Sequence, residues 1–262
     1  MAQWQVTDPQ RIEVDGEVGR LEVSLVRGRV SVLGAPGPAR IEISQVGRRP
    51  LHVEHVNGRL RIHHGAKRLP AVLWWVFSRR YRCDVTVAVP PETPADVTVV
   101  EGRAAVAGLL TKTDVDVTSG RVSLLGLAGT TRAKLVSGPV EAIGIAGDLT
   151  VESVSGDLAV AQSGADRVRA TTVSGTITCD VDSSAPTEIR LSTVSGEIAV
   201  RVPADSDLVV DLTAASGSIT TAFALDASGR PWSSRVRGRL GAGTGSLRAD
   251  TTSGRIALLA SE

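Results

Sequence analysis

The chain has 262 residues and a formal net charge of +1 at pH 7, with 42% hydrophobic but only 3% aromatic residues. The near-neutral charge excludes a general polyanion-binding protein, and narrow cores of aliphatic side chains need few rings. No secretory signal is visible at the N-terminus, and the longest apolar stretch, residues 69–77, is too short to span a bilayer. We therefore expect a cytoplasmic protein that reaches a membrane only peripherally.

Residues 1–20 predict an entry strand or cap, because Ile12 and Val14 alternate with charged neighbours. A repeated unit begins at Leu21 and recurs to the C-terminus. Its clear copies centre on a Ser-Gly dipeptide, and three variant copies bring the number to about ten. The clear copies contain Ser119, Ser137, Ser155, Ser174, Ser195, Ser216 and Ser253, and the variants contain Arg27-Gly28, Asn57-Gly58 and Glu101-Gly102.

Each copy follows one template, numbered from the serine as position zero. Position +3 is a branched apolar residue in all seven clear copies and position −4 is apolar, whereas positions −5 and −3 are often charged. Alternation on both sides of the Ser-Gly predicts a short strand, a corner and a second short strand. Glycine at position +1 supplies the backbone freedom that a corner needs.

Two all-β folds could use this template. Successive units could stack in parallel as a β-solenoid (β-helix) of about ten short coils. Alternatively, each Ser-Gly could be a hairpin turn in an antiparallel β-meander that forms a sandwich or barrel. The charged columns favour the solenoid, because stacking would bring opposite charges together. The stacked pairs would be Asp114 with Arg132, Asp116 with Lys134, and Lys134 with Glu152.

Residues 51–64 form a unit that holds all four histidines: His52, His55, His63 and His64. If Asn57-Gly58 turns tightly, His52 faces His63 and Glu54 lies opposite Arg61. A closed metal site needs three or four ligands, so we interpret these histidines as solvated surface residues and expect no metal. Cys83 and Cys179 fall on inward-facing strand positions, which indicates two buried, reduced thiols.

Two insertions interrupt the template, at residues 65–82 and 227–245. Both are basic and aromatic and contain no acidic residue. We expect both to leave the template after position +5 and to project from one edge as a binding surface, although the first aromatics could instead cap the core. The candidate binding residues are Trp74, Trp75, Phe77, Arg79, Arg80, Arg82, Arg230, Trp232, Arg235, Arg237 and Arg239.

The prolines at 90, 91 and 94 mark the predicted boundary between an N-terminal part, residues 1–90, and a regular repeat part, residues 91–262. The Val-Ser-Gly repeats, the Arg-Pro-Leu-His-Val-Glu-His segment at 49–55 and the Asp-Val-Thr-Val-Ala-Val-Pro-Pro segment at 84–91 resemble a bacterial β-strand-repeat family of unknown function, the "putative adhesins". The resemblance implies a β-helical solenoid with no established enzymatic activity.

The sequence contains no nucleophile elbow, phosphate-binding loop, paired-cysteine metal motif or calcium repeat. We therefore expect no enzyme, no cofactor and no small-molecule substrate. The predicted function is a non-enzymatic scaffold that presents its insertions to a protein partner or to an anionic membrane surface. The alternatives are an adhesin at the cell surface and self-association end to end into filaments. Nucleic-acid binding is disfavoured, because no recognition helix or stacking sheet is evident.

Overall fold

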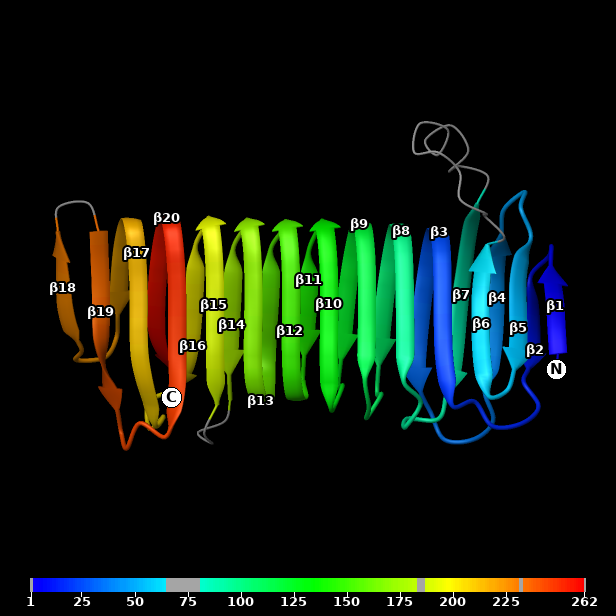
Figure 1. The fold of residues 1–262 in the computed structure, drawn as a ribbon, viewed down its shortest axis with the longest axis horizontal. Coiled ribbons are helices and arrows are strands. Elements are labelled where there is room, and N and C mark those ends of the chain that lie inside the picture. Colours follow the sequence, from blue (N-terminus) through cyan, green and yellow to red (C-terminus); the bar gives the residue numbers. More distant parts are fainter. Residues whose placement is uncertain (1, 65–80, 183–186, 231–232, 262) are drawn as a thin grey trace. The chain divides into compact units, whose positions relative to one another are not determined.

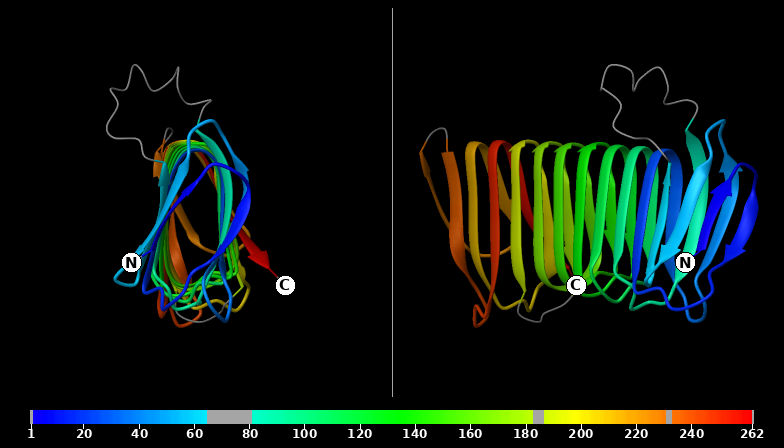
Figure 2. Two further views of the ribbon diagram at one scale, coloured as in Figure 1. Left: turned by 90° about the vertical axis from the view of Figure 1, so that its right-hand side faces the viewer. Right: turned by 45° about the vertical axis from the view of Figure 1, so that its right-hand side comes forward.

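The computed structural model describes residues 2–64, 81–182, 187–230 and 233–261. Every regular element in these ranges is a strand, which confirms the all-β prediction (Figure 1). The chain divides into two compact units, Met1–Ala133 (unit 1) and Lys134–Glu262 (unit 2). In each unit, strands lie in two facing layers with the core between them (Figure 2).

Unit 1 joins parallel and antiparallel strands. Like positions of the template pair in parallel: Gly28 of β3 lies beside Gly102 of β8, which lies beside Gly120 of β9. Antiparallel pairs, such as β1 with β5 and β2 with β4, occur toward the N-terminus. The strands are β1 (Ala2–Val6), β2 (Gln10–Glu13), β3 (Arg20–Gly34), β4 (Arg40–Val46), β5 (Leu51–Val56), β6 (Arg59–His64), β7 (Arg82–Val89), β8 (Ala95–Ala107) and β9 (Thr113–Leu125); β10 (Thr130–Ser137) crosses the boundary between the units.

Unit 2 repeats the parallel pairing with little variation. Ser155 of β12 pairs with Ser174 of β13, and Ser174 pairs with Ser195 of β15. The remaining strands are β11 (Val140–Ile143), β12 (Ala146–Ser155), β13 (Leu158–Ser174), β14 (Ile177–Val181), β15 (Glu188–Ser195), β16 (Ile198–Pro203), β17 (Leu208–Thr221), β18 (Asp226–Arg230), β19 (Ser233–Leu240) and β20 (Gly245–Ser261). Parallel pairing of like positions, the basis of the stacking prediction, is therefore confirmed within both units.

The order of the last strands in space differs from their order in the chain. β20 pairs with β15 and β16 on one side and with β17 on the other (Figure 1). Ser253 consequently lies between Ser195 and Ser216. β17 then pairs with β19, and β19 with β18, both antiparallel. The second insertion thus forms a strand hairpin at the edge of the sheet.

The apolar columns of the template form the core. Val140, Leu158, Ile177, Ile198 and Ile256, all at position +3, are buried. Ile219 is only half-buried, because β17 is the last parallel strand of the stack. The charged columns contribute as well: Lys134 lies 3.3 Å from Glu152, as predicted. Asp114 forms its ion pair with Lys112, at 2.8 Å, whereas the sequence predicted Arg132.

The structure corrects the interpretation of Asn57-Gly58. These residues have φ angles of 51° and 72° and form the tight turn between the antiparallel strands β5 and β6. The corner glycines have φ near 150°, as at Gly102 (151°) and Gly120 (147°). Asn-Gly suits a two-residue hairpin, because both residues tolerate positive φ. It is therefore not a copy of the template corner.

The first insertion also leaves the template at a different place from the one predicted. β6 and β7 both pair in parallel with β3, so that His63 lies beside Ser24 and Arg82 beside Arg27. In β3 only two residues, Leu25 and Val26, lie between Ser24 and Arg27. Residues 65–80 therefore interrupt the template between position −2, His64, and position −1, Tyr81. The second insertion follows Thr221, at position +5 as predicted. The expectation of one shared exit point is wrong.

We predict that glycine is required at the corner of the template. A Cβ on Gly156, which has φ +155°, would lie 1.8 Å from the carbonyl oxygen of Gly138, whereas nothing lies within 4 Å of a Cβ on Gly164. Gly156→Ala should lower the free energy of unfolding by about 3 kcal/mol, and Gly164→Ala should change it by less than about 1 kcal/mol. Urea denaturation of both variants checks this, and equal effects would contradict it.

We also predict that the first insertion is dispensable for folding, since its flanking strands pair with β3 on their own. Replacing residues 65–80 with Gly-Ser-Gly should preserve the β-sheet circular dichroism spectrum. The midpoint of thermal unfolding should stay the same or rise, because a shorter loop costs less closure entropy. An unfolded or aggregated variant would show that the insertion completes the core.

Candidate binding surface

The structure describes only some of the predicted binding residues. Trp74, Trp75, Phe77, Arg79, Arg80 and Trp232 lie outside the described residues, and Arg230 belongs to β18 but its side chain is not described. Arg82, Arg235, Arg237 and Arg239 are described. Arg82 lies in unit 1, and the other three lie on β19 in unit 2.

Two of the β19 arginines are engaged within the protein. Arg235 and Arg237 approach Asp211 of β17, at 2.8 Å and 3.3 Å. Hydrogen bonding from Arg235, supported by Arg237, holds the pKa of Asp211 below its ordinary value. The insertion has no acidic residue of its own, so its sequence gave no sign of this partner. These arginines fasten the hairpin to β17, while Arg239 stays exposed.

Arg82 lies in an open groove of about 450 Å³ at the corner of unit 1. We call it the corner groove. It spans three neighbouring strands, because β3 pairs with both β7 and β8. Its lining residues are Arg27, Gly28, Arg29, Arg82, Asp84, Glu101, Gly102 and Arg103. Arg29 and Arg103 were not among the predicted binding residues, although both occupy position +2 of their copies.

The corner groove carries excess positive charge. Four arginines face two carboxylates, which gives a formal charge of +2. Arg27 pairs with Glu101 at 2.9 Å, and Asp84 accepts a hydrogen bond of 3.0 Å from the backbone N–H of Arg29. Within the described part of the chain, the guanidinium groups of Arg29, Arg82 and Arg103 form no ion pair. The groove can therefore offer several guanidinium donors to an anion.

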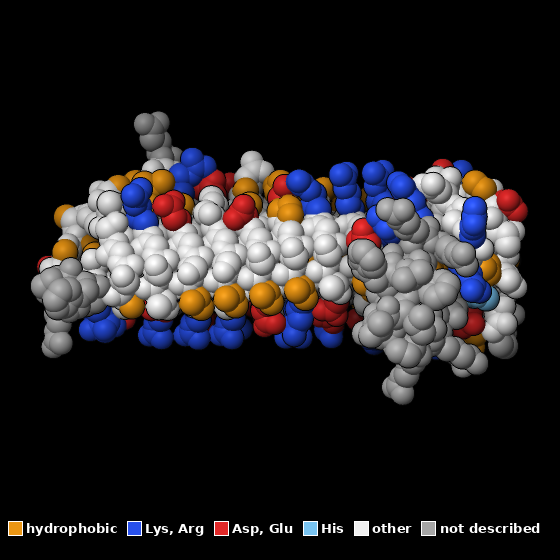
Figure 3. Space-filling view, turned by 90° about the horizontal axis from the view of Figure 1, so that it is seen from above, with side chains coloured by type: hydrophobic (Ala, Val, Ile, Leu, Met, Phe, Trp, Pro, Cys, Tyr) orange, Lys and Arg blue, Asp and Glu red, His pale blue; other side chains and the backbone are white. Residues whose placement is uncertain are grey.

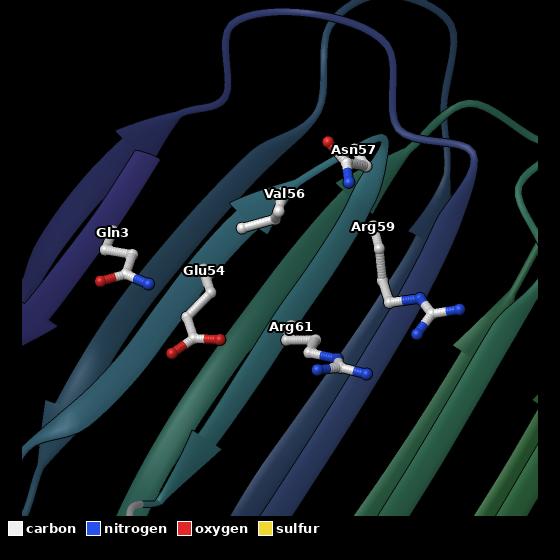
Figure 4. A pocket seen from close by; sticks show the side chains of 6 residues that line it. All are labelled: Gln3, Glu54, Val56, Asn57, Arg59 and Arg61. Carbon is white, nitrogen blue, oxygen red and sulfur yellow. The ribbon is translucent and has the colours of Figure 1, made fainter. Parts of the chain in front are cut away.

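A second hollow of about 450 Å³ lies over β1, β5 and β6 (Figure 4). Gln3 and Glu54 lie on one side of it and Arg59 and Arg61 on the other. Both arginines pair with Glu22 of β3, at 3.3 Å and 2.7 Å. Glu22 and Glu54 together balance the charge of the two arginines, so this hollow is less suited to an anion than the corner groove.

Unit 2 exposes apolar side chains beside the Ser-Gly column. Position −1 is valine in four consecutive copies, and each of these side chains is about half exposed; they are Val136, Val154, Val173 and Val194. Figure 3 shows hydrophobic side chains in a row on this side of the molecule. The alternating pattern of the sequence did not predict this exposed column.

The histidine prediction is correct for one pair. His52 pairs with His63, with the rings stacked 5.6 Å apart, and Glu54 pairs with Arg61. No cluster of three or more metal-ligating side chains occurs among the described residues. His64, however, is 5% exposed rather than solvated. It occupies the place that Leu25 has in β3, and its ring contacts Tyr81 edge-on at 5.6 Å.

Burial controls the protonation of three groups. It lowers the pKa of His64 to about 4, with His63 and His52 adding to the effect. It raises the pKa of Cys83 and of Cys179 to about 12. Both cysteines are buried free thiols, as predicted. They remain protonated at neutral pH, so neither is a ready nucleophile.

Comparison with solved structures found chains that are similar to this one to different degrees. A "putative adhesin" from Bacteroides fragilis NCTC 9343 is 13% identical with a TM-score of 0.51, over 96% of this chain and 97% of its own. A "putative adhesin" from Parabacteroides merdae ATCC 43184 is 11% identical with a TM-score of 0.40, over 96% and 95%. A "putative lipid binding protein" from Parabacteroides distasonis ATCC 8503 is 11% identical with a TM-score of 0.31, over 97% and 95%.

No protein-family model and no curated protein matches the chain. The similarity to the Bacteroides fragilis protein is one of fold, and at that level it confirms the resemblance drawn from the repeats. The described residues include no helix long and apolar enough to cross a membrane.

We predict that His64 makes unit 1 sensitive to acid. Its folded-state pKa of about 4 lies below the unfolded value of 6.5, so the unfolded chain binds more protons between these values. Stability should therefore fall as the pH falls through this window, by about 1.4 kcal/mol per pH unit. His64→Leu, which copies Leu25, should remove that slope, whereas His55→Gln should keep it. Denaturant unfolding at several pH values measures the slope, and an unchanged slope in His64→Leu would refute the assignment.

Proposed function

We propose that the chain is a non-enzymatic β-solenoid scaffold that binds an anionic partner where the first insertion joins unit 1. One observation carries this proposal. Arg82, at the end of the insertion, lies in the corner groove with Arg29 and Arg103, and among the described residues these three guanidinium groups form no ion pair. A surface that holds unpaired positive charge attracts anionic partners.

The parallel ladders support the solenoid part of the proposal. Copies of the template pair in register from β3 to β9 in unit 1 and from β12 to β17 in unit 2. Such stacked units expose the same template positions repeatedly and tolerate insertions at their corners. The scaffold would thus hold an insertion in place without taking part in chemistry.

An anionic membrane surface fits the insertion best. Its sequence combines arginines for phosphate headgroups with Trp74, Trp75 and Phe77, and tryptophan is favoured at the interface between lipid and water. An acidic segment of a protein partner would use the same arginines. An adhesin-like role at the cell surface is the second candidate, supported by the fold similarity to the Bacteroides fragilis "putative adhesin".

Flotation with lipid vesicles tests the proposal. The native chain should float with vesicles of phosphatidylserine and phosphatidylcholine, but not with phosphatidylcholine alone. The double variant Trp74→Ala/Trp75→Ala and the variant with Gly-Ser-Gly in place of residues 65–80 should lose most of this binding. Arg255→Gln, an exposed position +2 arginine in unit 2, serves as the control and should float like the native chain.

Equal flotation of all four proteins would end the membrane version. A pull-down from cell extract with the native chain and the loop-replaced variant would then examine a protein partner. Cell fractionation that places the protein wholly in the cytosol would remove the adhesin-like alternative.

A further inference from the structure

We propose that the corner groove is a binding site for a phosphate dianion, carried by a phosphomonoester. The inference rests on the proposed function and names the ligand class at that site. It depends only on described residues, since the groove is formed by β3, β7 and β8.

The arrangement of the arginines matches a phosphate group. Arg82, Arg29 and Arg103 come from three neighbouring strands, which are spaced about 4.8 Å apart. Their long side chains can therefore converge on one anion from several directions. Guanidinium groups bind phosphate with paired, charge-assisted hydrogen bonds. The formal charge of +2 in the groove balances a dianion.

The carboxylates of the groove are largely occupied. Glu101 is neutralised by Arg27 at 2.9 Å. Asp84 accepts the backbone N–H of Arg29 at 3.0 Å, which fixes it beside the arginines and leaves it as the main source of repulsion toward an anion. Asp84→Asn should therefore keep the hydrogen bond from the backbone N–H of Arg29, through its amide oxygen, and remove the negative charge.

The fold itself fixes the site. Gly28 and Gly102 lie at the corner, with φ of 132° and 151°, and a Cβ on Gly102 would lie 1.8 Å from the carbonyl oxygen of Gly28. This close stacking places the residues before and after each glycine at the surface on both sides of the corner. Arginine at position +2 in two adjacent copies consequently produces a pair of neighbouring guanidinium groups.

Isothermal titration calorimetry with inorganic pyrophosphate measures the binding of a soluble phosphate to the corner groove. Arg103→Gln should weaken binding about tenfold, the change expected for loss of one charge-assisted hydrogen bond. Asp84→Asn should bind more tightly than the native chain. Arg255→Gln, which changes the same template position in unit 2, should bind like the native chain. Circular dichroism and thermal unfolding of each variant show that the fold is intact.

A second experiment, with lipid vesicles, distinguishes a lipid headgroup from a soluble phosphate as the ligand. Vesicles of phosphatidic acid in phosphatidylcholine present a phosphomonoester, and vesicles of phosphatidylserine do not. Preference for phosphatidic acid that Arg103→Gln abolishes would identify a lipid headgroup, and pyrophosphate binding alone would identify a soluble phosphate compound. The inference is overturned if neither probe binds, or if Arg103→Gln and Arg255→Gln weaken binding equally.

The two proposals can fail separately. The variant with Gly-Ser-Gly in place of residues 65–80 keeps Arg82, Arg29 and Arg103, so it should bind pyrophosphate like the native chain. Loss of flotation in this variant with intact pyrophosphate binding supports both proposals. Intact flotation of the loop-replaced variant, together with lost pyrophosphate binding in Arg103→Gln, would overturn only the membrane role of the insertion.

Discussion

The close stacking of glycines at the corner is the constraint on which the rest of the structure depends. A Cβ on Gly120, Gly156 or Gly196 would lie between 1.6 Å and 2.0 Å from the carbonyl oxygen of the glycine in the neighbouring copy. No other residue type fits, both because of this distance and because of the positive φ. The requirement fixes the register of each copy against the next. It thereby aligns the apolar positions −4 and +3, which form the buried columns.

The same constraint explains where the chain can vary. Residues on either side of the corner glycine face outward, so their identity does not affect the core. In four copies of unit 2 the residue before the glycine is serine, with an exposed valine before it. In unit 1 the corresponding positions of β3 and β8 hold Arg27 and Glu101, and each is followed by an arginine at position +2. One backbone arrangement thus carries a small, neutral corner in these copies and a cationic groove at β3 and β8.

The sequence predicted the features that repeat and missed those that depend on which copies are neighbours. The alternation around Ser-Gly was enough to predict strands and corners, and the charged columns favoured parallel pairing. Ser195, Ser216 and Ser253 have equivalent surroundings, however, so local pattern could not show that Ser253 lies between the other two. Arg82 was predicted because it stands in a basic segment. Arg29 and Arg103 were missed because the groove exists only when β7, β3 and β8 are side by side.

The position of the first insertion shows how such a fold can accept an inserted segment without interrupting its core. His64 and Tyr81 flank the insertion and are both buried, as Leu25 and Val26 are in β3. The buried positions of the template therefore continue from β6 to β7 on the two sides of the insertion. Cys83 takes the position of the corner glycine without a positive φ. The copy that follows the insertion therefore has no glycine at the corner. Its first arginine, Arg82, lies in the corner groove with Arg29 and Arg103.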